Sequence, residues 1–254
     1  MIKKAEKCHK DQIVKLWNIA FGDNINSVNK YLDTLLKYFF VYEDEGIVKA
    51  MLSVIPVSYL DKNGGYIYAV VTHPDYRGQG ICKRLIDTIK EDKKYDFLVL
   101  VPQNEGLFKF YKRMNFVEVP LLVKKETKVK IEADTKLDLK KIDVHEYESL
   151  RNQYKDNMIK WGIEMLAFAK SMYGGEFYRI EHEENTGFAF LYREKKTLVI
   201  KELIVNNHEK IAEKIGSRLG TEKVVFSYPA KEGEPTYMIY PNTFQDAYFG
   251  IYLD

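Results

Sequence analysis

One stretch of the 254-residue chain decides the fold, and it reads Val70-Val71-Thr72-His73-Pro74-Asp75-Tyr76-Arg77-Gly78-Gln79-Gly80-Ile81. The run from Tyr66 to Thr72 is apolar and aromatic, which is typical of a buried strand. Pro74 ends that strand, and the segment from Ile81 to Lys93 carries apolar residues at helical spacing along one face. The pattern predicts a strand, a glycine-rich turn and a helix.

A glycine-rich turn that opens a helix is a general anion-binding device. The first backbone N–H groups of a helix lack intrahelical partners, and the helix dipole adds partial positive charge. Gly78 and Gly80 let the backbone approach a phosphate, and Arg77 adds a charge-assisted hydrogen bond of about 1.5–3 kcal/mol. The spacing fits neither a Walker loop nor a dinucleotide fingerprint, since no third glycine follows at 82–84.

The segments around this turn indicate a mixed α/β layer. Helices are expected at 12–21, 27–37 and 105–113, and strands at 38–42, 47–60, 97–101 and 116–119. The segment 61–65, which ends in two glycines, is expected to be a tight turn between two strands. Helices, antiparallel strands and then a strand–helix–strand unit favour helices packed on a mixed sheet.

The stretch quoted above closely resembles the acetyl-CoA motif of the GNAT superfamily of N-acetyltransferases. The turn of that family is Arg or Gln, two residues, Gly, one residue, then Gly or Ala. Arg77, Gly80 and Cys82 stand at these three positions, and Cys82 departs from the pattern while remaining small. The resemblance implies a GNAT acyl-CoA acyltransferase fold.

A second motif strengthens the resemblance. Asn104 is followed by Tyr111 at the end of an expected helix and then by Asn115-Phe116, where the family has Gly-Phe. Asparagine tolerates the left-handed conformation of a helix C-terminal cap, so that exchange is mild. The two motifs cover about residues 1 to 120.

The resemblance implies how acetyl-CoA is held and used. The residues expected to bind the co-substrate are Val70, Val71, Thr72, Arg77, Gly78, Gln79, Gly80, Ile81, Cys82, Asn104 and Tyr111. A backbone N–H of the strand, taken to be that of Val71, would stabilise the oxyanion while a neutral amine attacks directly. Tyr111 would protonate the departing thiolate. Cys82 is interpreted as a packing residue and not as a nucleophile.

The general base is not settled by the sequence. Many GNAT enzymes carry a Glu on the strand before the glycine turn, but 66–72 contains no acid. His73 is adjacent, although a His before Pro in a turn is more often a surface residue. In the enhanced-intracellular-survival acetyltransferases, which this chain distantly resembles, the terminal carboxylate enters the active site. Asp254 is a candidate for the same role.

The second half of the chain is expected to form a smaller lobe. The sequence predicts a cofactor-binding domain over 1–130 and a degenerate GNAT-like domain over 131–254. Strands at 188–193, 197–205 and 224–228 with a helix at 209–219 repeat the order of the first half. The turn before that helix is Asn206-Asn207-His208, without glycines, and chance similarity of common elements remains the alternative.

Composition narrows the classes of function. Lysine and arginine total 39 against 37 acids, so the net charge of +2 favours neither a nucleic-acid nor a membrane partner. The two cysteines, Cys8 and Cys82, match no metal-ligand spacing and indicate a reducing compartment. With no apparent signal peptide, a cytoplasmic protein is expected.

The sequence thus predicts an acetyl-CoA-dependent N-acetyltransferase with no metal, whose acceptor is a small-molecule or peptide amine. A longer acyl donor and a non-catalytic CoA-binding regulatory module are the alternatives. The identity of the acceptor and the oligomeric state stay open.

Overall fold

The computed structural model describes residues 1–130, 136–154, 157–183 and 185–253. Two compact units emerge from the contacts within the chain. Unit 1 consists of Met1–Val117 and Met238–Phe244, and unit 2 consists of Glu118–Tyr237 and Gln245–Asp254. A short segment near the C-terminus therefore belongs to the N-terminal unit.

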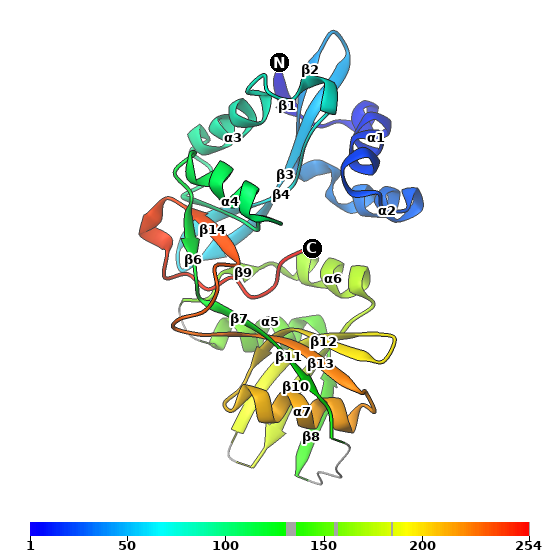
Figure 1. Ribbon diagram of the computed structural model, residues 1–254, viewed down its shortest axis with the longest axis vertical. Coiled ribbons are helices and arrows are strands. Elements are labelled where there is room, and N and C mark those ends of the chain that lie inside the picture. The colour runs from blue at the N-terminus through cyan, green and yellow to red at the C-terminus, as the bar shows by residue number, and fades with distance from the viewer. Residues whose placement is uncertain (131–135, 155–156, 184, 254) are drawn as a thin grey trace. The chain divides into compact units, whose positions relative to one another are not determined.

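Unit 1 is a twisted sheet with helices on both faces (Figure 1). Its strands follow the order β1-β2-β3-β4-β5-β14. Their bounds are β1 Ile2–Lys4, β2 Phe39–Asp44, β3 Ile47–Tyr59, β4 Lys62–Thr72, β5 Phe97–Leu100 and β14 Tyr237–Tyr240. Helices α1 (Lys10–Phe21) and α2 (Ile25–Leu35) lie on one face, and α3 (Ile81–Glu91) and α4 (Glu105–Lys112) on the other. Short 3-10 turns occur at Lys7–His9, Leu36–Tyr38, Pro74–Tyr76 and Asn242–Phe244.

The core of unit 1 forms where α3 and α4 cover the sheet. Leu85, Ile86 and Ile89 of α3 are almost fully buried against the strands, together with Met238 of β14. These helix residues are the apolar face that the sequence predicted. The opposite face of the sheet is covered by α1 and α2, where the Trp17 ring contacts Tyr31 at a centroid distance of 4.8 Å.

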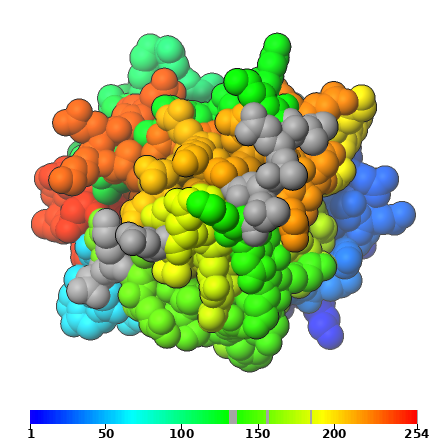
Figure 2. Space-filling model, turned by 90° about the horizontal axis from the view of Figure 1, so that it is seen from below, coloured from blue at the N-terminus to red at the C-terminus, as the bar shows by residue number. Residues whose placement is uncertain are grey.

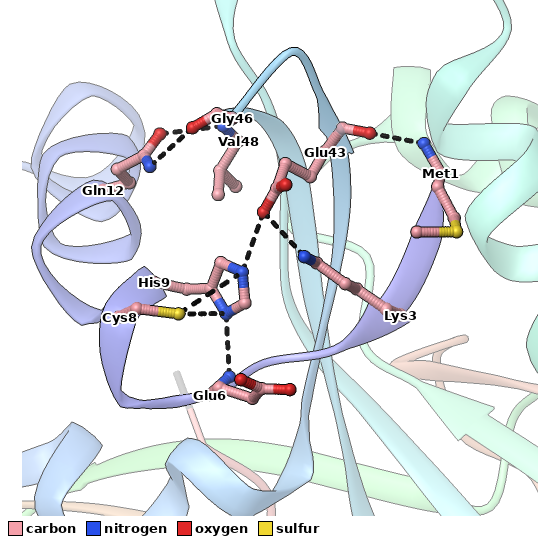
Figure 3. Close-up of polar contacts among 9 residues, drawn as sticks. All are labelled: Met1, Lys3, Glu6, Cys8, His9, Gln12, Glu43, Gly46 and Val48. Carbon is pink, nitrogen blue, oxygen red and sulfur yellow. Dashed lines mark hydrogen bonds and ion pairs between the residues drawn. The ribbon is translucent and has the colours of Figure 1, made fainter.

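A polar cluster fixes the start of the chain to β2 (Figure 3). The buried His9 ring accepts the Glu6 N–H at Nδ1, at 2.8 Å, and its Nε2 lies 2.8 Å from Glu43 Oε2. Lys3 Nζ lies 3.0 Å from the same carboxylate oxygen. The Lys3 ammonium, and after it His9, hold the pKa of the Glu43 carboxyl below its usual value. Gln12 adds two hydrogen bonds to the β2–β3 turn, at Gly46 O and Val48 N.

The turn between β3 and β4 is shorter than the predicted segment 61–65. Only Leu60 and Asp61 separate the two strands, and the sequence from Lys62 to Gly65 already belongs to β4. Gly64 is needed there for space, since a Cβ on it would lie 2.2 Å from the Phe97 ring of β5. Here glycine marks close packing between neighbouring strands and not a change of direction.

Unit 2 is a second sheet, ordered β7-β13-β12-β11-β10-β8. Its strands are β7 Leu122–Lys128, β8 Leu137–Ile142, β10 Glu176–His182, β11 Asn185–Glu194, β12 Thr197–Ile204 and β13 Lys223–Pro229. Its helices are α5 Val144–Gln153, α6 Ile163–Tyr173 and α7 His208–Arg218. The short strands β6 (Val117–Val119) and β9 (Lys160–Trp161) complete the described elements. In the space-filling view, segments of unit 2 that are distant in sequence pack side by side, from green to orange (Figure 2).

A buried ion pair stands at the centre of unit 2. Arg151 of α5 and Glu202 of β12 are 1% and 0% exposed, and Arg151 Nε donates to Glu202 Oε2 at 2.8 Å. The Tyr147 hydroxyl donates to the same oxygen at 2.8 Å. The pair joins α5 to β12, and the sequence analysis gave no sign of it.

Candidate active site

The site of unit 1 begins where two parallel strands separate. β4 and β5 are paired from Gly64–Phe97 to Ile67–Leu100, where β5 ends, while β4 continues to Thr72. Beyond Ile67, β4 pairs among the described residues with β3 alone. One edge of the backbone from 68 to 72 therefore faces the opening between the strands, where an extended ligand can pair with it.

A β-bulge lies in this exposed part of β4. Ser53 pairs with Tyr68 but Met51 pairs with Val71, so β4 holds an extra residue at this point. Ala69 has a φ of 53°, which is rare for a residue with a side chain. Bulges of this kind re-aim the backbone next to functional sites. The predicted oxyanion donor, the Val71 N–H, comes directly after the bulge.

The glycine turn follows and opens α3. Gly78 and Gly80 have φ of 76° and 71°, both in the left-handed region, and Gly80 is the N-cap of α3. A Cβ on Gly78 would meet no atom within 4 Å, so its conformation and not its surroundings requires glycine. The turn therefore presents open backbone at a helix N-terminus, as the sequence predicted, with Gln79 between the glycines and the buried Ile81 beginning the helix.

Two arginines brace the turn. Arg77 Nε donates to the carbonyl oxygen of Thr72 at 3.2 Å, and Arg84 Nη1 donates to the carbonyl oxygen of Gln79 at 3.0 Å. The Arg84 guanidinium also lies 5.3 Å from the centroid of the Tyr42 ring. The sequence analysis did not assign Arg84 to the site. Its position one helical turn after Gly80 was the available signal.

Thr72 supplies an unsatisfied polar atom at the end of β4. Its Oγ1 is buried and has no hydrogen-bond partner in the described structure. A buried hydroxyl without a partner costs about 1–3 kcal/mol, so such an atom needs an explanation. A ligand lying along the open edge of β4 would provide one.

Tyr111 lies in the core behind the turn, and the partly buried Cys82 packs against that core. Tyr111 is 5% exposed and packs on Phe116 at a ring-centroid distance of 5.8 Å. Burial raises the pKa of Tyr111 well above its usual value, with a smaller contribution from Cys82. Burial also raises the pKa of the Cys82 thiol to about 12, so this side chain is not a thiolate at neutral pH. Both groups therefore keep their protons at neutral pH, so Tyr111 has a proton to donate and Cys82 is interpreted as a packing residue.

Asn104 and His73 have local structural roles. Asn104 is the N-cap of α4, where its side chain accepts the Leu107 N–H at 3.0 Å. His73 caps the turn at Pro74–Tyr76, with Nδ1 accepting the Asp75 N–H at 3.3 Å. The Nδ1 atom of His73 is therefore occupied, and Asn104 orients the helix that carries Tyr111.

The remaining predicted residues fall into two groups. The backbone of Val70, Val71 and Thr72 borders the strand opening, next to the turn formed by 77–80. Asp254 lies outside the described residues, so its predicted role is untested.

In the part of the chain that the structure describes, no three His, Cys, Asp or Glu side chains are placed to hold a metal ion. No helix of the described chain is long and apolar enough to cross a membrane.

Comparisons with known proteins agree with this geometry. Residues 36–118 match the model of the acetyltransferase (GNAT) domain family. No curated protein sequence matches the chain significantly. Among solved structures, a GCN5-related N-acetyltransferase from Anabaena variabilis superposes with a TM-score of 0.73 at 15% identity, over 94% of this chain and 72% of that chain.

Two further structures share the arrangement. A putative acetyltransferase from Pyrococcus horikoshii has a TM-score of 0.63 at 14% identity, over 100% of this chain and 94% of that one. Eis1 from Mycobacterium abscessus has a TM-score of 0.62 at 7% identity, over 94% and 73%. At such low sequence identity, these superpositions show a shared fold and nothing about activity. Residues 36–118 therefore match the GNAT domain family, and the chain has a GNAT-like mixed α/β fold with two sheets.

Proposed function

We propose that this protein is an N-acetyltransferase that takes an acetyl group from acetyl-CoA and transfers it to a primary amine. The observation that carries the proposal is the opening between β4 and β5, which leads directly into the glycine turn at the N-terminus of α3. The resident residues fit such a donor, since the opening offers an unpaired backbone edge and the turn offers unshielded backbone for a diphosphate.

The chain contributes positioning and two polar groups to the reaction. The β4 edge and the turn at 77–80 would hold the pantetheine arm and the diphosphate of acetyl-CoA, which supplies the acetyl thioester. The Thr72 hydroxyl, buried without a partner in the described structure, is a further donor along this path. A backbone N–H on the open edge of β4 would stabilise negative charge on the carbonyl oxygen as an amine attacks it.

Tyr111 is the proposed proton donor to the leaving sulfur. Its buried hydroxyl is neutral at physiological pH because burial raises its pKa. No carboxylate is available on β4 itself, because 62–72 contains neither Asp nor Glu. An amine that arrives unprotonated would need no base on this strand.

The first test is thermal unfolding with and without acetyl-CoA, using NAD and ATP as controls. A ligand present at a hundred times its dissociation constant adds about 2.7 kcal/mol of stability. We expect acetyl-CoA alone to raise the midpoint, which would justify a screen of amines for thiol release. No shift in a folded protein would contradict acetyl-CoA binding.

Tyr111→Phe tests whether the bound donor is used. The variant should lower kcat by about a hundredfold or more, since a general acid typically contributes about 10²–10⁴. The acetyl-CoA-induced shift in midpoint should be unchanged, because the ring still packs on Phe116. Unaltered turnover would remove Tyr111 from the mechanism.

A second candidate is a CoA-binding regulatory module without activity. The missing carboxylate on β4 favours it. A midpoint shift with acetyl-CoA, combined with no thiol release across small-molecule and peptide amines, would support this alternative.

A further inference from the structure

Unit 2 repeats the strand opening of unit 1. β12 and β13 run parallel from Thr197–Lys223 to Ile200–Phe226, after which β12 continues to Ile204 paired with β11. A bulge follows the last paired residue, since Phe190 pairs with Glu202 but Leu191 pairs with Ile200. In unit 1 the pairing ends at Ile67–Leu100, and a bulge follows at Ala69.

The helix after the opening also begins in the same way. The N-cap of α3 is Gly80 with a φ of 71°, and the N-cap of α7 is Asn207 with a φ of 55°. The connection in unit 2 is shorter and has no glycine and no arginine between Val205 and His208. Unit 2 therefore keeps the opening but lacks the turn suited to a diphosphate.

A cavity of about 830 Å³ lies at this opening, entirely within unit 2. Its lining includes Ile204 of β12 and Ala230 after β13, and the aromatic residues Phe188 of β11 and Tyr154 after α5. The Phe188 and Tyr154 rings meet edge-on at a centroid distance of 6.0 Å. The volume lies within the range of about 300–1,000 Å³ typical of small-molecule sites.

Arg179 lines the cavity and carries a buried donor without a partner in the described structure. Arg179 Nη2 lies 2.6 Å from Glu146 Oε1, but Arg179 Nε is buried and has no partner within the described residues. Unsatisfied buried donors of this kind are expected where a ligand supplies the acceptor.

The charged and ionisable residues of the lining favour an anion. Arg179, Lys231 and His208 line the cavity, and His208 is the first residue of α7, where the helix dipole is positive. Glu181 is the one carboxylate among the described lining residues. An acceptor with negative charge matches this set, and the aromatic and aliphatic walls match an apolar body.

We infer that unit 2 binds a small organic oxyanion, a carboxylate or a phosphate monoester with an apolar body, in the cavity at the β12–β13 opening. This site is separate from the acetyl-CoA site proposed for unit 1 and does not depend on it.

The test is calorimetric titration of the full chain with benzoate and with phenyl phosphate. Benzylamine, with a similar ring and the opposite charge, is the contrasting ligand. We expect one saturable site for an anion and at least about tenfold weaker binding of benzylamine. The better of the two anions identifies the head group.

Variants then locate the bound anion. Arg179→Gln should weaken binding at least about tenfold, and Glu181→Gln should strengthen it. Arg218→Gln, at the exposed far end of α7, is the matched control and should change nothing. Because Arg179 also pairs with Glu146, Ala230→Phe provides a second test, as its ring would fill the cavity and abolish binding.

Arg77→Gln separates this proposal from the one for unit 1. Binding that survives Arg77→Gln and is lost in Arg179→Gln supports the cavity in unit 2. The reverse result would assign the anion to the glycine turn and overturn the inference, as would the absence of saturable binding by either anion.

Discussion

Gly78 and Gly46 share one backbone conformation but differ in their place in unit 1. Both have a φ of 76°, and a Cβ on either would meet no atom within 4 Å. Gly46 lies in the β2–β3 turn beside Glu45, whose φ is also positive at 50°, as a tight hairpin turn requires. Gly78 lies in the turn proposed to hold the diphosphate. Comparing substitutions at Gly78 and Gly46 therefore separates the effect of backbone strain from the effect of contact with the ligand.

We expect Gly78→Ala and Gly46→Ala to lower the free energy of unfolding by a similar amount, about 1 kcal/mol, because alanine is strained at this φ. Only Gly78→Ala should reduce the midpoint shift caused by acetyl-CoA, since its methyl group stands where the phosphate would approach. Thermal unfolding of both variants with and without acetyl-CoA measures this. Equal shifts in the two variants would mean that the turn does not hold the ligand.

Cys82 makes stability depend on pH. Burial raises the pKa of its thiol from 9.0 to about 12 in the folded state. The unfolded chain therefore loses this proton first as the pH rises, and the stabilisation present below about pH 9 is lost progressively up to about pH 12, by at most about 1.4 kcal/mol per pH unit.

Replacing Cys82 with Ala removes this group and nearly conserves its volume. The fall in unfolding free energy between pH 8 and pH 10, measured with urea, should be smaller in Cys82→Ala than in the natural chain. The exposed Cys8 supplies the control, because Cys8→Ala should leave the slope as it is. Identical slopes in all three proteins would contradict a raised pKa of the thiol at position 82.

At the scale of elements, the Arg151–Glu202 pair holds α5 on β12. Both side chains are essentially unexposed, so either one alone would be a buried charge without compensation. The Tyr147 hydroxyl and the Arg151 guanidinium together satisfy the Glu202 carboxylate. A buried ion pair of this kind adds little net stability, but removing one partner destabilises the protein strongly because the other charge stays buried.

Arg151→Met alone should destabilise unit 2 by about 3–5 kcal/mol, because it leaves Glu202 buried and unpaired. The double variant Arg151→Met with Glu202→Leu should recover much of that loss, since no charge remains buried. Chemical denaturation of the two single variants and the double variant gives the coupling energy. Additive effects would show that the two groups do not interact.

The bounds of the helices and strands show which elements can be predicted from the local sequence alone. α3, α4 and α7 occupy nearly the residues predicted, because each carries an apolar face whose helical spacing is visible in the sequence. α6, β10 and β14 were not predicted. β14 has four residues, too few for a periodic pattern to identify, and its position depends on pairing with β5.

At the scale of the whole molecule, the division of the chain is discontinuous. Met238, Ile239 and Tyr240 pair with Leu100, Val99 and Leu98 of β5 although they are far along the chain. The segment 238–244 thereby places β14 beside β5 in the sheet of unit 1. Met238 and Ile239 are fully buried there.

A fragment of residues 1–130 should therefore fold poorly. Without β14 it exposes the edge of β5, and such an unpaired apolar edge promotes aggregation. Circular dichroism and soluble yield of this fragment measure the effect, and addition of a peptide spanning 236–246 should increase the folded fraction. A fragment that unfolds cooperatively at the midpoint of the full chain would show that β14 is dispensable.

The strand–turn–helix at 66–91 and the two motifs that carry the family resemblance could be read from the sequence, because they depend on patterns within a few residues. The sequence by itself did not determine the braces from Arg77 and Arg84, the capping role of Asn104 or the buried pair in unit 2. Those depend on which side chains the folded chain brings within hydrogen-bond distance. The cavity at the β12–β13 opening could not be predicted from the sequence either. It lies where two strands that are paired over four residues diverge. Local propensity is encoded residue by residue, whereas the divergence of strands and the burial of charge follow from long-range packing.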